Sequence, residues 1–190
     1  MPRRENRSRR RGPLRTARPR LLVVIGSLRT EQDYLIGLRD SAGTRAVDIQ
    51  LVRKAKSPTA VVAYAANFVA RAPDDFDEVW CVYDVDEFEV EPASREAARH
   101  RFQLAVSDPC FELWLLLHHE DCAAFLNGYR EVERRLRKHL PGYDKTRLDF
   151  ADHADGVGDA IRRAEKLGDS GNPSTDMWRL ATRIRTEEEQ

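Results

Sequence analysis

Short apolar runs alternate with amphipathic segments along most of the chain. The apolar runs predict strands at residues 21–25, 47–52, 79–83 and 102–106. Segments with apolar residues at helical spacing follow the first three runs, at residues 30–43, 59–71 and 92–100. A strand-helix-strand-helix-strand order is typical of an α/β fold with a mostly parallel sheet flanked by helices.

The second half of the chain predicts four more helices, at residues 110–119, 125–140, 157–167 and 176–186. The first of these is apolar on nearly every side, so it should be buried. Glu112 is the exception within it, and an unpaired carboxylate in an apolar site is costly. Glu112 therefore needs either a structural partner or a role in a functional site, and the sequence leaves both open.

Polar residues stand where several of these helices should begin. Thr30 can cap the first helix, with Asp33 three residues later in a capping-box-like arrangement. Ser57 before Pro58 is a cap followed by proline at the first helical position. Asn172-Pro173-Ser174-Thr175 predicts a turn that caps the last helix.

The length of 190 residues suits one domain with one core. We assign the domain to residues 21–186, after an arginine-rich arm at 1–20 and before an acidic tail at 187–190. The arm holds nine of the 32 Lys and Arg residues but one of the 32 Asp and Glu residues, so the rest carries a net charge of about −8. Such an arm should be disordered by itself. It could contact phosphates, solubilise the chain or fold onto the acidic body.

The spacing of the cysteines and the lengths of the apolar runs indicate the cellular compartment of the protein. The three cysteines form no C-x-x-C pair, which argues against a disulfide framework and fits a reducing cytoplasm. No apolar run approaches the length of a membrane span, and no signal-peptide core follows the basic N-terminus. We expect a soluble, cytoplasmic protein without membrane association.

Acidic residues gather where the predicted parallel strands end. The third strand leads into Asp84 and Asp86, and this spacing points both side chains to one face of an extended backbone. The turn after the first strand should expose Glu31, and Ser107-Asp108 ends the fourth strand. Because the carboxyl ends of parallel strands share one edge, these groups should lie close together. Adjacent carboxylates repel unless a cation joins them, and hard oxygen ligands select Mg²⁺ or Mn²⁺.

The sequence also allows three alternatives to a Mg²⁺ or Mn²⁺ site. A solvated acidic turn is the plain alternative, because acids also stand at positions 87, 89 and 91. A nucleophilic Ser107 is weaker, since no nearby histidine has an evident orienting acid. A zinc site from Cys110, His118 and His119 is weaker still, because adjacent helical histidines point about 100° apart.

The helix at 125–140 has a basic face that includes Arg134, Arg137 and Lys138. A run of this kind is usually a solvated surface, but it could instead form a nucleic-acid patch. In that case these side chains and the arm would position phosphates.

Five motifs occur in order along the chain: Thr30-Glu31-x-x-Tyr34, Asp84-x-Asp86, Ser107-Asp108-Pro109-Cys110-Phe111-Glu112-x-Trp114, Tyr143-x-Lys145 and Asn172-Pro173-Ser174-Thr175. Together they resemble RloB-like proteins over about residues 3–182. The resemblance implies a divergent Toprim-like (Rossmann-like) domain with extra C-terminal helices, akin to the nuclease part of the OLD family. It also implies bacterial defence against phage, action on nucleic acid including tRNA, and in some systems an ATPase partner.

By this resemblance, Asp84 and Asp86 match the Toprim Asp-x-Asp metal ligands. One position departs from the pattern, which has a glutamate before the glycine that follows the first strand. Here Ile25 precedes Gly26, and isoleucine can neither ligate a metal nor move a proton. Either Glu31 takes over the carboxylate role, or the site is weakened or dead.

We therefore predict a Mg²⁺- or Mn²⁺-dependent nuclease, with RNA favoured over DNA. Asp84, Asp86 and Glu31 would hold the metal, Glu112 is a further carboxylate of the catalytic site, and Lys145 would stabilise charge in the transition state. The expected substrate contacts are Arg29, Thr30, Ser107, Arg134, Arg137 and Lys138. The alternative is an inactive subunit that binds nucleic acid or an ATPase partner.

Overall fold

The computed structural model of the protein describes residues 19–26, 29–43, 47–51, 57–85, 90–168 and 171–185. Five strands form one sheet in the order β2-β1-β3-β4-β5. They are β1 (Leu21–Ile25), β2 (Val47–Leu51), β3 (Glu78–Asp84), β4 (Gln103–Asp108) and β5 (Ser174–Thr175). The first four strands pair in parallel, and β5 pairs antiparallel with the end of β4. The expected α/β fold with a mostly parallel, Rossmann-like sheet is confirmed.

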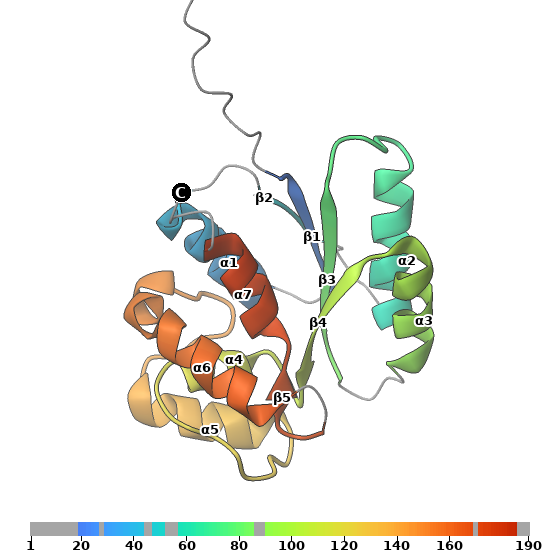
Figure 1. The fold of residues 1–190 in the computed structure, drawn as a ribbon. Helices are drawn as coiled ribbons and strands as arrows, with labels where there is room; N and C mark the ends of the chain where they lie inside the picture. The colour runs from blue at the N-terminus through green and yellow to red at the C-terminus, as the bar shows by residue number, and fades with distance from the viewer. Residues whose placement is uncertain are drawn as a thin grey trace, which may run out of the picture.

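Helices cover both faces of the sheet, as Figure 1 shows. One face carries α2 (Pro58–Val69) and α3 (Glu91–His100), and the other carries α1 (Arg29–Ser41) and α7 (Met177–Arg185). Beside the second pair lie α4 (Glu112–Leu117), α5 (Tyr129–His139), α6 (Val157–Leu167) and the short 3-10 turns η1 (Phe150–Asp152) and η2 (Ala154–Gly156). Among the described residues, no helix combines the length and apolar character needed to cross a bilayer.

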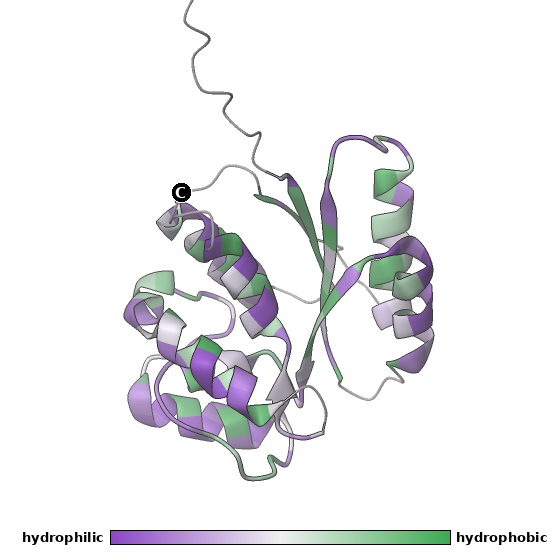
Figure 2. Cartoon of the chain, in the orientation of Figure 1, coloured by the Kyte–Doolittle hydropathy of each residue, from purple (hydrophilic) through white to green (hydrophobic). Residues whose placement is uncertain are grey.

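Strand β1 explains why the sheet is covered on both faces, since all five of its residues are fully buried. Leu21, Val23 and Ile25 belong to the core that includes α1 and α7, while Leu22 and Val24 belong to the core that includes α2 and α3. A strand buried on both faces has to be apolar at every position, which is the pattern in the sequence. Figure 2 shows the apolar strands between helices that carry most of the polar residues.

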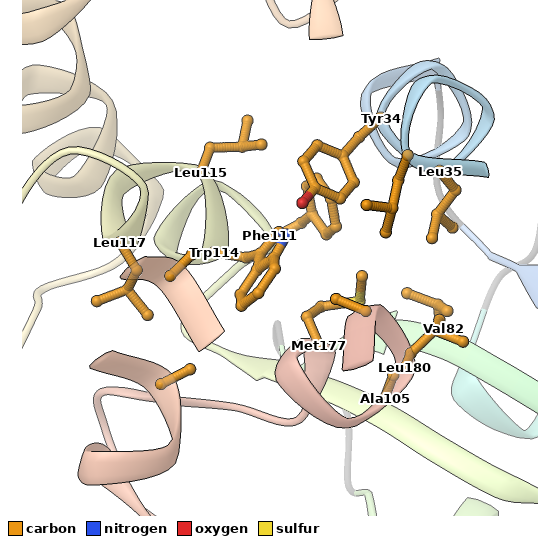
Figure 3. Close-up of a cluster of buried hydrophobic side chains, with 14 of the residues drawn as sticks. Tyr34, Leu35, Val82, Ala105, Phe111, Trp114, Leu115, Leu117, Met177 and Leu180 are labelled. Carbon is orange, nitrogen blue, oxygen red and sulfur yellow. The ribbon is translucent and has the colours of Figure 1, made fainter. Parts of the chain in front are cut away.

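The larger core is built around aromatic contacts between α1 and α4. The ring of Tyr34 meets those of Phe111 and Trp114 edge to face, with centroids 5.7 and 6.1 Å apart. Met177 and Leu180 from α7 lie next to this group in Figure 3. Every residue of α4 is buried, including its first residue, so the start of this helix is held firmly beneath the carboxyl edge of the sheet.

Several local predictions can be compared with the structure. Ser57 accepts a hydrogen bond from the Ala60 amide at the start of α2, which confirms the predicted cap. Thr30 does not cap α1, because the helix begins one residue earlier and the Thr30 hydroxyl bonds elsewhere. The predicted cap of the last helix is present, since Thr175 accepts a hydrogen bond from the Met177 amide at the start of α7. Ser174 and Thr175 also extend the sheet as β5, which the sequence did not predict. The predicted arm and acidic tail fall almost entirely outside the described residues.

Gly37, in the middle of α1, allows η1 to pack closely against the helix. A Cβ atom at position 37 would overlap Cβ and Cγ of Phe150. Replacing glycine by alanine inside a helix normally stabilises it by up to about 1 kcal/mol. Here we expect Gly37→Ala to lower the free energy of unfolding by about 1–3 kcal/mol, because the collision forces Phe150 to move. Urea denaturation measures the change.

Gly142→Ala is the matched control, because a Cβ there meets nothing within 4 Å and the backbone is not in the left-handed region. Its unfolding free energy should stay close to that of the wild type. A Gly37→Ala protein as stable as the control would show that η1 is not held against α1.

Candidate functional site

The carboxyl ends of β3 and β4 lie side by side at the lower end of the sheet in Figure 1. Asp84 is the last residue of β3, and it is paired in register with Ser107 of β4. The chain then turns through a cis Asp108–Pro109 bond into Cys110 and α4, which begins at Glu112. Asp84 and Glu112 therefore come to the same edge from different elements, as the strand order predicts.

Cys110 is buried at the turn between β4 and α4. Burial raises the pKa of Cys110, and the negative charges of Glu112 and Asp84 raise it further. Both carboxyl groups thus act on one buried thiol, which lies at the turn between β4 and α4. The thiol stays protonated at neutral pH, so it is a poor nucleophile.

Glu112 is buried, and its partner is a phenol. Tyr143 donates a hydrogen bond from its hydroxyl to Glu112 Oε1 over 3.1 Å, and both residues are buried. Burial raises the pKa of Tyr143, and the charge of Glu112 and the hydrogen bond to it raise it further. The phenol therefore remains a donor at neutral pH. The question that the sequence left open is answered in part, since Glu112 has a structural partner, while its role in a functional site stays a prediction.

Lys145 lies two residues beyond Tyr143 and is held by its backbone. The Thr30 hydroxyl of α1 donates a hydrogen bond to the Lys145 carbonyl over 2.6 Å. The Lys145 Nζ lies 5.0 Å from the centre of the Tyr129 ring, within the range of a cation–π contact. Burial and then the charge of Glu112 raise the pKa of Tyr129.

Glu31 is buried in the first turn of α1, although the sequence predicted an exposed turn. Thr30, an expected substrate contact, is buried as well, because the segment around Lys145 lies against this turn. Asp86 falls outside the described residues. Within the described part of the chain, no three His, Cys, Asp or Glu residues stand close enough together to hold a metal ion.

The other expected substrate contacts have partners within the protein. Ser107 is buried, and its hydroxyl lies 2.8 Å from that of Thr175 in β5. Asp108 accepts a hydrogen bond from the Asn172 side chain over 3.1 Å. The Asn172–Thr175 motif therefore fastens the end of β4. Arg29 is exposed and lies 3.6 Å from Asp33.

The basic face of α5 is exposed but partly neutralised. Arg134 lies 3.7 Å from Glu131, and Arg137 lies 3.0 Å from Glu133. Exposed pairs of this kind contribute at most about 1 kcal/mol each, so the arginines can exchange partners for phosphates at little cost. Lys138 is also exposed on this helix.

With this geometry in view, comparison with protein families gives one match. The family model described as RloB-like protein matches residues 21–184. The chain belongs to the RloB-like family. Comparison with curated proteins and with solved structures gives no match.

The RloB-like match spans the candidate site from Glu31 to Lys145. Sequence reasoning placed Asp84, Glu112 and Lys145 in this site. In the structure Glu112 is bonded to Tyr143, and the Lys145 ammonium lies over the Tyr129 ring. The two tyrosines were not among the predicted site residues. The Tyr143-x-Lys145 motif could have identified Tyr143 as a site residue. Tyr129 begins α5, whose sequence pattern indicates only a basic face, so nothing in the sequence pointed to it.

Proposed function

We propose that this RloB-like protein is a Mg²⁺- or Mn²⁺-dependent phosphodiesterase that cleaves nucleic acid, with RNA favoured over DNA. One observation carries the proposal: Asp84 ends β3 in register with Ser107 of β4, and β4 leads directly into α4, which begins with the buried Glu112. Acids brought together in this way repel each other, and a divalent cation removes that repulsion.

The donors present suit a hard cation. Mg²⁺ usually keeps several waters and is bound by one or two carboxylates together with substrate phosphates. Asp84 would be the first ligand, with Glu112, Glu31 or Asp86 completing the set. When bound, the ion would polarise the phosphodiester and supply an activated water.

The protein's own cations would act on the substrate. Lys145 is exposed, its ammonium lies over the Tyr129 ring, and its carbonyl accepts a hydrogen bond from Thr30. Its ammonium would stabilise the charge that develops on the phosphate. Arg134, Arg137 and Lys138 on α5 would hold phosphates further along the strand, without reading the base sequence.

The direct test combines cleavage with metal binding. The full-length protein is incubated with single-stranded RNA, tRNA and duplex DNA, each with Mg²⁺, Mn²⁺ or EDTA. We expect cleavage of RNA that EDTA abolishes. Mn²⁺ at about 100 times its Kd stabilises the fold by about 2.7 kcal/mol, which for a chain of this length raises Tm by roughly 5–10 °C. No cleavage and no change in Tm would reject the proposal.

A second candidate function rests on Ile25, which is fully buried and lies at the end of β1 beside the candidate site. No carboxylate is available at this position. The protein would then be a non-catalytic defence subunit that binds nucleic acid or docks on an ATPase partner. This function predicts salt-sensitive RNA binding without any metal-dependent product.

A further inference from the structure

The loop between α4 and α5 presents an exposed phenylalanine. Among the described residues, Phe125 and Tyr64 are the large hydrophobic residues that are exposed, at 70% and 36%. Tyr64 lies on α2 and stacks on Phe68 of the same helix. A phenyl ring left in water forgoes the favourable free energy that its burial would give. The exposure of Phe125 therefore needs a reason.

Hydrogen bonds fix this loop at the carboxyl edge of the sheet. The Asn172 side chain accepts a hydrogen bond from the Leu126 amide over 2.8 Å and donates one to the Leu126 carbonyl over 3.0 Å. It also donates to Asp108, at the end of β4, over 3.1 Å. Leu126 is itself buried. Phe125 is therefore held in an exposed position beside the end of β4.

A row of cations on α5 begins directly after the loop. Arg130, Arg134 and Lys138 recur every four residues, so they lie along one side of the helix, and all three are exposed. The Asn127 amide donates a hydrogen bond to the Glu131 carboxylate over 2.8 Å, which ties the loop to the first turn of α5. An exposed aromatic ring thus stands at the start of a row of positive charges.

We propose that Phe125 stacks on an unpaired base of a single-stranded nucleic acid, whose phosphates lie along Arg130, Arg134 and Lys138. This inference rests on the proposed action on nucleic acid and specifies the form of the substrate. Proteins bind single strands by combining cations that follow the backbone with aromatic rings on which bases stack. Bases within a duplex are already stacked on each other, so they cannot cover the ring.

The surroundings of Phe125 suit a base better than a protein partner. A specific protein–protein interface buries about 800 Å² on each partner, and its centre is depleted of charged residues. The exposed apolar residues next to Phe125 in the chain are Ala123 and Ala124, which are small, and the charged α5 follows. One base needs only the face of one ring, and its phosphates need the cations.

The test is binding of the full-length protein to a single-stranded RNA of about 12 nucleotides, measured by fluorescence anisotropy in EDTA. Phe125→Ala should raise the Kd about 5- to 150-fold, the loss expected for one stacked base. Phe125→Leu should cause a similar loss, because leucine is apolar but has no flat face. Phe125→Trp should bind at least as tightly as the wild type. All three variants should keep the wild-type Tm, because the side chain is exposed.

Controls separate stacking from other contacts. Tyr64→Ala removes an exposed aromatic side chain from α2 and should leave the Kd unchanged. Arg130→Gln should lower the slope of log Kd against log salt by about 0.7, the value for one phosphate of a single strand, whereas Phe125→Ala should not change this slope. For a duplex of the same sequence, the Kd of Phe125→Ala should match that of the wild type.

Equal Kd values of the wild type and Phe125→Ala for the single strand would overturn the proposal, as would an equal loss on the duplex. A changed oligomeric state of Phe125→Ala with unchanged RNA affinity would also overturn it and assign the ring to a contact between copies of the chain. In each case, RNA cleavage that EDTA abolishes leaves the proposed function standing. Conversely, single-strand binding that needs Phe125 but gives no cleavage product supports this inference and rejects the metal-dependent phosphodiesterase.

Discussion

Asp84→Asn is expected to reduce metal-dependent RNA cleavage about 10³-fold or more while leaving the protein folded. A thousand-fold loss corresponds to about 4 kcal/mol of transition-state stabilisation. Asparagine has nearly the same size as aspartate but lacks the charge that binds the cation and balances the other acids. Under the proposal, the substitution relieves repulsion among the metal-binding acids, so Tm in EDTA should equal or exceed that of the wild type. Single-turnover cleavage and thermal melting measure the two effects.

Asp77→Asn is the control for this substitution. Asp77 precedes the same strand at its opposite end, is exposed, and accepts a hydrogen bond from the Arg20 amide. Its cleavage rate should match that of the wild type. If Asp84→Asn cleaves RNA as fast as Asp77→Asn, Asp84 is not a metal ligand and the nuclease proposal fails.

The largest effect on stability should come from acid, through histidines packed between α1, α4, α5 and the η turns. The ring of His153 lies 5.3 Å from those of both His118 and His119, and His119 stacks on His139 at 5.4 Å. His118 is held by Tyr34 and by the Trp114 carbonyl. The Nδ1 atom of His153 and the Nε2 atom of His119 are buried without a hydrogen-bond partner.

Burial lowers the pKa of these histidines. The pKa of His118 falls from 6.5 to about 3, through burial and the neighbouring charge of His153. The pKa of His153 falls to about 4, through burial and the neighbouring charge of His119, and that of His119 is also lowered. Below pH 6.5 the unfolded chain therefore binds protons that the folded protein excludes. Stability from this cluster is present above pH 6.5 and is lost as the pH falls toward 4.

We expect the free energy of unfolding to fall by about 3 kcal/mol per pH unit between pH 6 and pH 4. In this range the unfolded chain binds a proton at His118 and another at His153, and the folded protein largely excludes both. Replacing His153 by phenylalanine keeps an aromatic ring at this position. It removes one of the two proton-binding sites and also the buried Nδ1 atom that lacks a hydrogen-bond partner. His153→Phe should therefore halve the slope and stabilise the protein more at pH 5 than at pH 8. Urea denaturation at several pH values measures it.

His100→Phe is the control, because His100 is exposed on α3 and pairs with Glu96. The slope of its unfolding free energy between pH 6 and pH 4 should stay close to that of the wild type. A slope for His153→Phe equal to that of the control would show that His153 does not contribute to acid sensitivity.

The pattern of apolar residues along the chain was enough to predict the fold class. The all-apolar strand at residues 21–25 and the helix that begins at Ser57-Pro58 are found where they were expected. These features depend on local sequence, because the spacing of apolar residues and the helix cap both involve residues that are close together in the chain. Asp84 could be predicted at the site for the same reason, since a residue that ends a buried parallel strand lies at the carboxyl edge.

What only the tertiary structure decided is which polar groups meet. Thr30 bonds to Lys145 across 115 positions, and Tyr143 reaches Glu112 across 31. In the sequence, Thr30 looked like a helix cap, because a hydroxyl before an amphipathic segment has the same pattern whether it bonds to the helix or to a distant carbonyl. Strand β5 was missed for a related reason, since two residues carry no periodicity and form a strand through the free edge of β4. Such pairings depend on how elements cross in space, which local patterns do not encode.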